Sequence, residues 1–360
     1  MQPAFLKVAS IGRLLAPRPS GRPAPRRLAV ASLSALALAA LCGPTAAQSN
    51  ADAESAAAAW PTRPVTLMVP YAAGGPVDTV ARLMAVRVSE LMGQQMVIEN
   101  LGGAGGMTGA ARAARARPDG YNALLSGSAI MTQIPNFRKS MPYDPIKDFE
   151  HSALFADSAR VLIARKDFPA ADFKELQAYM KTHASKLQYG TAGAGTGSHT
   201  CALLLDRAMG VKTTHVPYRG SALAMQDLLA GRIDFIAEQI STAIPQIKSG
   251  AVKAYATLGL ERGPGLEDLP TAAEFGLKGI DCGAWIGFDF PKGTPQAIVR
   301  KMSEISDKAI DTPELVERFK QIGVVVPAKN RRSPEYFVEY IKSELERWKG
   351  PIKDSGITLD

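Results

Sequence analysis

Apolar and polar positions along the chain follow two alternating patterns. Short apolar runs such as VTLMVP, residues 65–70, are typical of buried strands, and many are followed by apolar residues at helical spacing. After this first run, the residues expected on one helical face are Val80, Leu83, Met84, Val88 and Leu91. Gly93 stands where a helix commonly ends. Because strand-like and helix-like segments alternate along most of the chain, we expect an α/β fold with mostly parallel sheets flanked by helices.

A glycine-rich loop joins this first strand to its helix. It contains Gly74 and Gly75 and ends at Asp78, which can cap or charge the first helical turn. In such a unit, free backbone N–H groups and the positive helix end point at one spot, which favours an anion. The loop has no Lys, Arg, Ser or Thr before Thr79, so main-chain donors would have to hold that anion. The alternative is a glycine turn that only reverses the chain.

The second half of the chain repeats this plan. A strand is expected at residues 187–191, and the loop from Ala192 to His199 leads into a helix. Thr196 and Ser198 add hydroxyl groups, and we expect Ser198 to donate to a charged ligand. Two helix N-termini, one in each half, could each hold one end of a small diacid in a cleft between domains. The alternatives are a nucleotide-type glycine motif or a simple turn, and for His199 a capping or packing role.

Two domains are the expectation for a chain of this length. About 310 residues follow the leader described below, and such a length is ordinary for two domains. The strands after Val252 resume the pattern of the first half, and the last helix needs a core on which to pack. We therefore expect one domain to comprise residues 60–158 plus 258–360 and the other 159–257, with the ligand cleft between them.

The first 47 residues are predicted to be a targeting segment. Six basic residues and no acidic residue precede or adjoin an apolar stretch at 28–41, and Thr45-Ala46-Ala47 offers a small-residue cleavage site. The apolar stretch is short for a membrane span. We expect residues 1–47 to be a signal peptide for export to the periplasm, and residues 48–59 to be a disordered lead-in.

Removal of the leader lowers the net charge of the chain. The chain has 42 basic and 34 acidic residues, so loss of the six leader basics leaves 36 against 34, a net charge of +2. No basic cluster interleaved with aromatic residues occurs in the remainder. We therefore expect no nucleic-acid partner.

The sequence lacks the motifs of common catalytic and metal sites. It has no G-x-S-x-G elbow, no HExxH and no Walker loop. Its histidines show no metal-ligand spacing; they are His151, His183, His199 and His215. We expect a protein that is not an enzyme and that uses no metal or cofactor. Cys201 and Cys282 form no recognisable disulfide framework and are expected to be small buried residues.

Several stretches together resemble the solute-binding proteins of tripartite tricarboxylate transporters, the Bug or TctC-like family. They span essentially all of residues 60–358 in the family's order: Trp60-Pro61 with VTLMVPYAAGGPVD, VIENLGGAGG, RPDGYNALLS, LQYGTAGAGTGSH, VPYRGSALAMQDLLAGRIDF and WIGFDFPKGTP. The resemblance implies a two-domain periplasmic binding protein of type II-like fold, whose cleft closes on the ligand. It also implies a monomeric receptor that presents a small organic acid or related molecule to the membrane subunits of a transporter.

The resemblance also implies which residues bind the ligand. One clamp runs from Tyr71 to Gly75 and the other from Ala192 to His199, while Ala73 departs from the proline usual in the family. Leu101-Gly102 likewise replaces a common Arg-Pro pair. The expected ligand-binding residues are Tyr71, Ala72, Ala73, Gly74, Gly75, Asp78, Ser126, Ser128, Ala192, Gly195, Thr196, Gly197, Ser198, His199, Tyr218 and Glu238.

Two other functions remain open from the sequence. One is an exported α/β enzyme that uses the glycine loops for a phosphate or acyl substrate. The other keeps the fold but makes the protein a ligand-sensing partner of a membrane sensor, such as a sensor kinase. A carboxylate receptor is distinguished by the stability that it gains from its ligand.

Overall fold

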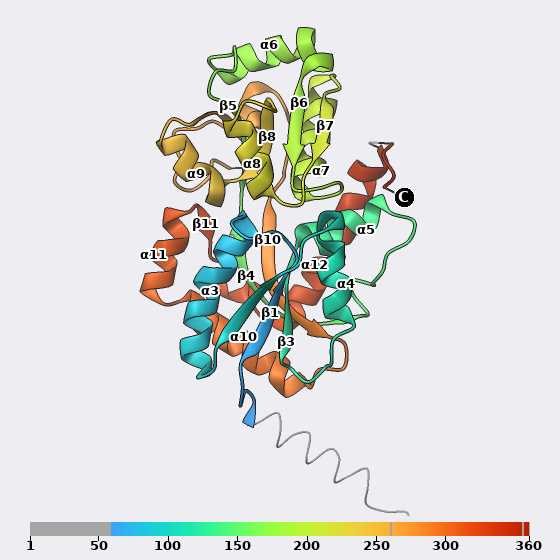
Figure 1. The fold of residues 1–360 in the computed structure, drawn as a ribbon, viewed down its shortest axis with the longest axis vertical. Helices are drawn as coiled ribbons and strands as arrows, with labels where there is room; N and C mark the ends of the chain where they lie inside the picture. Colours follow the sequence, from blue (N-terminus) through green and yellow to red (C-terminus); the bar gives the residue numbers. More distant parts are fainter. Residues whose placement is uncertain (1–58, 260, 355, 360) are drawn as a thin grey trace, which may run out of the picture. The chain divides into compact units, whose positions relative to one another are not determined.

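The computed structural model describes residues 59–259, 261–354 and 356–359, which build two β-sheets with helices around them (Figure 1). The predicted signal peptide and nearly all of the predicted lead-in lie outside the described residues. The first sheet has the order β11-β4-β10-β3-β1-β2, with β1 (Val65–Val69), β2 (Met96–Asn100), β3 (Asn122–Gly127), β4 (Phe149–Ser158), β10 (Ala284–Pro291) and β11 (Val324–Val325). The second has the order β7-β6-β8-β5-β9, with β5 (Arg160–Arg165), β6 (Gln188–Thr191), β7 (Thr214–Pro217), β8 (Phe235–Gln239) and β9 (Val252–Thr257).

Helices cover both faces of each sheet, because every helix has one apolar face that it buries against a sheet. Around the first sheet these are α3 (Pro76–Met92), α4 (Met107–Ala114), α5 (Ile134–Phe137), α10 (Gln296–Ile310), α11 (Pro313–Gln321) and α12 (Pro334–Asp354). Around the second they are α6 (Phe173–His183), α7 (Gly197–Met209), α8 (Ser221–Leu229) and α9 (Ile240–Lys248). Single turns occur at Ala104–Gly106, Ala129–Gln133, Ala184–Lys186, Ala272–Phe275 and Lys329–Arg331. Within the described part of the chain, no helix combines the length and apolarity that a membrane span needs.

The first strand–loop–helix unit forms as the sequence predicts. Val80 and Val88 of α3 are fully buried in the core beside β1. Gly93 ends the helix in the left-handed conformation at φ +72°, and its N–H bonds to the carbonyl of Ser89. Leu91 differs from the prediction, because it is 37% exposed. The buried stripe continues at Met92 instead, four residues after Val88.

Two sheets flanked by helices confirm the α/β prediction, but the expectation of mostly parallel sheets is wrong. β1 pairs in parallel with β2 and β3, and β6 with β7 and β8. In contrast, β10 is antiparallel to β3 and β4, and β5 is antiparallel to β8 and β9. β4 carries the chain out of the first sheet and β10 returns it, so these two neighbours run in opposite directions. β5 likewise carries the chain into the second sheet and its neighbour β9 carries it out.

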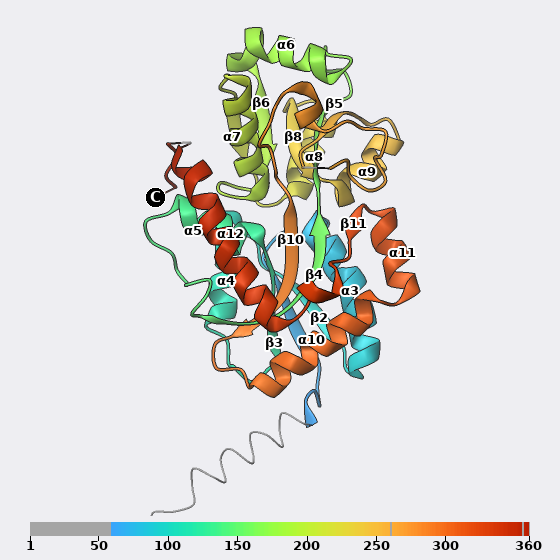
Figure 2. The same ribbon diagram turned by 180° about the vertical axis from the view of Figure 1, so that it is seen from behind.

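The chain passes from the first sheet to the second and back. Strands of the second sheet come from residues 160–257, and those of the first from residues on either side of that range. The returning strand β10 leads down from the second sheet in Figure 2. Before it, Leu258 and Leu277 are buried in the second sheet's core. There Cys282 forms a disulfide with Cys201 of α7; both are buried as predicted, and their pairing is an addition to the prediction.

Candidate functional site

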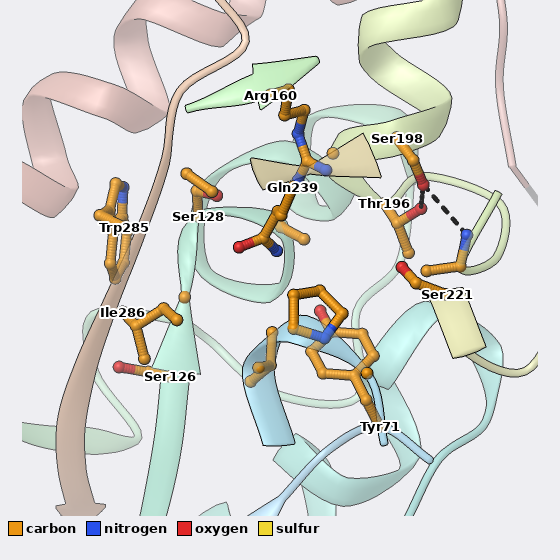
Figure 3. Close-up of a pocket in the computed structure, with 18 residues that line it drawn as sticks. Tyr71, Ser126, Ser128, Arg160, Thr196, Ser198, Ser221, Gln239, Trp285 and Ile286 are labelled. Carbon is orange, nitrogen blue, oxygen red and sulfur yellow. Dashed lines mark hydrogen bonds between the residues drawn. The ribbon is translucent and has the colours of Figure 1, made fainter. Parts of the chain in front are cut away.

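A cavity lies where the two sheets face each other, at the loops that follow β1, β3 and β6 (Figure 3). It encloses about 580 Å³ of space between atoms, including the part open to solvent. The lining residues are Tyr71, Gly75, Pro76, Val77, Ser126, Gly127, Ser128, Ala129, Arg160, Ala192, Thr196, Gly197, Ser198, Ser221, Gln239, Ala284, Trp285 and Ile286.

The first glycine loop is held by Asp78, whose side chain turns away from the cavity. Asp78 is 2% exposed, and its Oδ2 accepts hydrogen bonds from Gly74 N and Arg82 Nε, both at 2.8 Å. Its Oδ1 accepts a further bond from Asn100 Nδ2 at 2.9 Å. Burial alone would raise the pKa of Asp78, but these hydrogen bonds outweigh it and hold the pKa below its usual value. Asp78 therefore braces the loop and leaves Gly75 at the cavity wall.

The second glycine loop uses its hydroxyl groups largely within itself. Thr196 Oγ1 donates to the carbonyl of Gly193 at 2.6 Å. Ser198 Oγ accepts from Ala192 N at 3.0 Å and lies 3.1 Å from Thr196 Oγ1 (Figure 3). Because Thr196 has already donated its proton, Ser198 donates in that second contact. The N–H groups of the first turn of α7 have no intrahelical acceptor, so main-chain donors remain for a ligand.

His199 packs behind the second loop rather than at the cavity. It is 3% exposed, and its Nδ1 accepts a hydrogen bond from Gly195 N at 3.0 Å. Its ring stacks on His215 with centroids 4.1 Å apart, and on Phe137. Burial, with the neighbouring His215, lowers the pKa of His199 to about 3, so the ring is neutral and shapes the loop.

Half of the residues expected to bind the ligand line the cavity, and the others lie outside its lining. Tyr218 donates its hydroxyl to Asp227 Oδ2 at 2.8 Å. Glu238 is 1% exposed, and its Oε1 accepts from Gln239 N and Thr242 Oγ1. The expected residues on the lining are Tyr71, Gly75, Ser126, Ser128, Ala192, Thr196, Gly197 and Ser198; those outside it are Ala72, Ala73, Gly74, Asp78, Gly195, His199, Tyr218 and Glu238.

Arg160 is a cavity residue that the sequence analysis missed. It opens β5 and is 5% exposed, and the antiparallel register places it opposite Gln239 at the end of β8. A Cβ atom at Gly197 would collide with its guanidinium, so the missing side chain leaves room for it. The signal in the sequence was a single basic residue before the apolar run Val161 to Ala164.

Two further cavity residues that the sequence analysis missed carry buried polar atoms without a partner. Trp285 Nε1 and Gln239 Oε1 are buried without a hydrogen-bond partner among the described residues, as is Oγ of the expected Ser126. Ser221, at the start of α8, adds a hydroxyl group. A buried polar atom needs a partner, and a ligand in the cavity can supply one. The described residues hold no group of three or more potential metal ligands. The site can thus bind an anion by hydrogen bonds.

A family profile and a related sequence assign this chain to one protein family. The profile of the family described as "Tripartite tricarboxylate transporter family receptor" matches residues 80–357. A UPF0065 protein of Agrobacterium vitis is 41% identical over 297 residues, which are 82% of this chain and 86% of that protein.

Two solved structures share the fold over almost their whole length. The periplasmic binding protein BugD has a TM-score of 0.81 and 40% identity, over 84% of this chain and 100% of that one. MatC from Rhodopseudomonas palustris, solved with bound malate, has a TM-score of 0.79 and 38% identity, over 81% of this chain and 100% of that one.

Proposed function

The chain belongs to the tripartite tricarboxylate transporter receptor family, and from this premise we propose that it is an exported solute receptor. It captures a small carboxylate-bearing ligand between its two sheets and presents it to membrane transporter subunits. The observation that carries the proposal is the cavity on which both glycine loops converge with a buried guanidinium. Helix N-termini and arginine are the groups that recognise carboxylates. The malate in MatC supports a carboxylate of similar size.

The ligand in this proposal contacts the expected residues on the cavity lining. Gly75 and Gly197 bring helix N-termini to it, and Ser126 and Ser128 offer hydroxyl groups. The expected residues outside the lining act indirectly. Asp78 and His199 hold the two loops in shape through the hydrogen bonds described above.

Export and domain motion complete the proposal. Residues 1–47 direct the chain to the periplasm, where the mature monomer works without a cofactor. The two domains are those of the predicted division, 60–158 plus 258–360 and 159–257, and they close on the ligand. The segments that join the sheets at Ser158–Arg160 and before Ala284 serve as the hinge.

A thermal-shift screen of the mature protein with succinate, malate, glutarate and inorganic phosphate tests the function. A bound carboxylate should stabilise the protein by RT ln(1 + [L]/Kd), about 2.7 kcal/mol at a hundredfold excess over Kd. The diamides of the same acids are the matched controls, since they keep the shape without the charge. Recovery of the ligand unchanged by mass spectrometry is expected of a receptor. Stabilisation by phosphate alone, or turnover of an added acyl or phosphate ester, would favour an enzyme instead.

A further inference from the structure

Arg160 is a buried cation with almost no hydrogen-bond partners of its own. A guanidinium carries five N–H donors. Here Nη1 has a long contact of 3.5 Å to the carbonyl of Ala237, and Nε has no partner among the described residues. Burial lowers the pKa of Arg160, yet arginine stays protonated in proteins. A charge removed from water in this way needs an anion beside it.

Glu238 does not supply that anion at contact distance. Among the described residues, no ion pair within 4.0 Å joins it to Arg160. Its Oε1 is already bonded to Gln239 N and Thr242 Oγ1, both at 2.9 Å. Burial raises the pKa of Glu238 against the attraction of Arg160, which favours its uncharged form. The guanidinium donors therefore remain available to the cavity.

The guanidinium lies against the N-terminus of α7. Gly197 is the first residue of this 13-residue helix, and a side chain there would collide with Arg160. The N–H groups of the first turn have no intrahelical acceptor, and the positive end of the helix dipole lies at the same end of α7. Figure 3 shows Arg160 and Ser198 of this first turn at the same part of the wall. Two sources of positive potential thus meet beside Gly197.

We propose that Arg160 determines the charge specificity of the receptor by taking one carboxylate of the ligand between its guanidinium and the first turn of α7. This inference rests on the proposed function and adds which residue recognises the charge. The other end of the cavity offers neutral donors, Ser126 Oγ and Trp285 Nε1. A ligand therefore needs its negative charge at the Arg160 end, while its other end is held by neutral hydrogen bonds.

The test compares charged and uncharged ligands of one shape by calorimetry. Succinate, malate and glutarate are each titrated against their diamides, and the diacid that binds the wild-type protein most tightly is used further. Arg160→Gln should weaken the diacid by at least about 30-fold, because it removes one member of a buried charge pair. The diamide has no such pair, so the diacid-to-diamide affinity ratio should fall by a similar factor. The affinity of Arg160→Lys for the diacid should lie between those of the wild-type protein and Arg160→Gln. Lysine keeps the positive charge but lacks the planar guanidinium, which can bind a carboxylate through two hydrogen bonds.

Two further variants separate charge recognition from damage to the fold. Arg165→Gln is the matched control, because Arg165 lies on the same strand and pairs with Asp167 and Asp234 outside the cavity. It should leave the affinity ratio unchanged. Gly197→Ala should displace the guanidinium and weaken the diacid, but should add little in the Arg160→Gln background, because both changes act on one interaction.

The failures of the two proposals differ. If no diacid binds the wild-type protein, the carboxylate receptor is wrong, and the role of Arg160 falls with it. If a diacid binds but Arg160→Gln leaves its affinity intact, or weakens diacid and diamide equally, the receptor stands and the charge role of Arg160 is overturned. Additive effects of Gly197→Ala and Arg160→Gln would also overturn it.

Discussion

The glycine-rich loops after β1 and after β6 share one order of strand, glycine turn and helix but use their polar residues differently. In the first loop a buried carboxylate, Asp78, ties the turn together, and no buried cation reaches the wall from that loop. In the second, neutral groups tie the turn together, through Ser198 and His199, while Arg160 comes from β5, which is separated from β6 by β8 in the same sheet. Each loop thus separates the groups that shape it from the groups that face the cavity.

This difference teaches that similar sequence patterns can produce cavity walls of different charge: one without a charged side chain and one with a cation. Both helix N-termini favour an anion. At the first, the cavity is lined by Gly75 and Pro76, which have no polar side chain. At the second, the absence of a side chain at Gly197 admits a whole guanidinium. The four predictions that follow test this contrast, from the largest expected effect to the smallest.

Acidification should weaken the second loop well before the first. Burial and His215 lower the pKa of His199 to about 3, and burial lowers that of His215 to about 4. Below the ordinary histidine pKa of 6.5, the unfolded chain binds protons that the native state excludes, so stability falls as pH falls. We expect a loss of roughly 2 kcal/mol per histidine by about pH 5, measured by urea denaturation against neutral pH.

The first loop should resist this change. The pKa of Asp78 is held below its ordinary value of 3.8, so its stabilising effect is present above that value and is lost only as pH falls through the lower, folded-state pKa. His199→Gln should flatten the slope between neutral pH and pH 5, whereas His183→Gln, a change away from the loop, should not. An unchanged slope in His199→Gln would contradict the assignment.

Asp78→Ala should destabilise the fold through the first loop. The change leaves Gly74 N without its acceptor and Asn100 Nδ2 with only the carbonyl of Tyr71, and we expect a loss of about 3 kcal/mol in the free energy of unfolding. Glu90→Ala on the same helix is the control, because its ion pair with Arg87 is exposed and contributes less than about 1 kcal/mol. Equal losses of stability in the two variants would mean that Asp78 does not brace the first loop.

Ser198→Ala should weaken ligand binding through the second loop. The lost hydroxyl leaves Ala192 N without its acceptor and removes the contact with Thr196 Oγ1, which loosens the turn that presents the main-chain donors. We expect about 1–2 kcal/mol, or roughly 5- to 30-fold in Kd for the best diacid of the panel, by calorimetry. Lys349→Ala, at an exposed position on α12, should leave Kd unchanged. Equal affinities in the two variants would mean that this hydroxyl does not shape the site.

Gly75→Ala should have the smallest effect. A Cβ there would meet the carbonyl oxygen of Ala72 at an ordinary 3.6 Å, and the backbone is extended at φ −81°. Gly74 differs, since its φ of +82° favours glycine. We expect at most about a threefold change in Kd, against a clearly larger one for Gly197→Ala. A larger loss of affinity in Gly75→Ala than in Gly197→Ala would contradict the stronger role in binding that we assign to the second loop.

The sequence predicted the local units well, because their causes are local. The apolar stripe of α3, the end of α3 at Gly93 and the glycine turns of both loops depend on residues close in the sequence, and they appear as expected except at Leu91. The position of Tyr71, Ser126 and Thr196 on the cavity wall also agrees with what the family resemblance implied. Their contact with a ligand stays a prediction.

What the sequence could not predict depends on strand register and on contacts between distant residues. Arg160 reads as a lone basic residue before an apolar run, and Trp285 as a core aromatic. The antiparallel pairing of β5 with β8 places Arg160 opposite Gln239, and β10 brings Trp285 to the same cavity. The mixed sheets and the Cys201–Cys282 disulfide have the same origin.

Sequence alone thus determined the alternation of strands and helices, the two glycine loops and the family, because side-chain periodicity and turn chemistry act between near neighbours. The tertiary structure decided which polar groups are hydrogen-bonded within the fold and which face the cavity. That choice needs distances between residues far apart in the chain, such as Arg160 and Gly197, and burial then gives the remaining unpaired charge its strength.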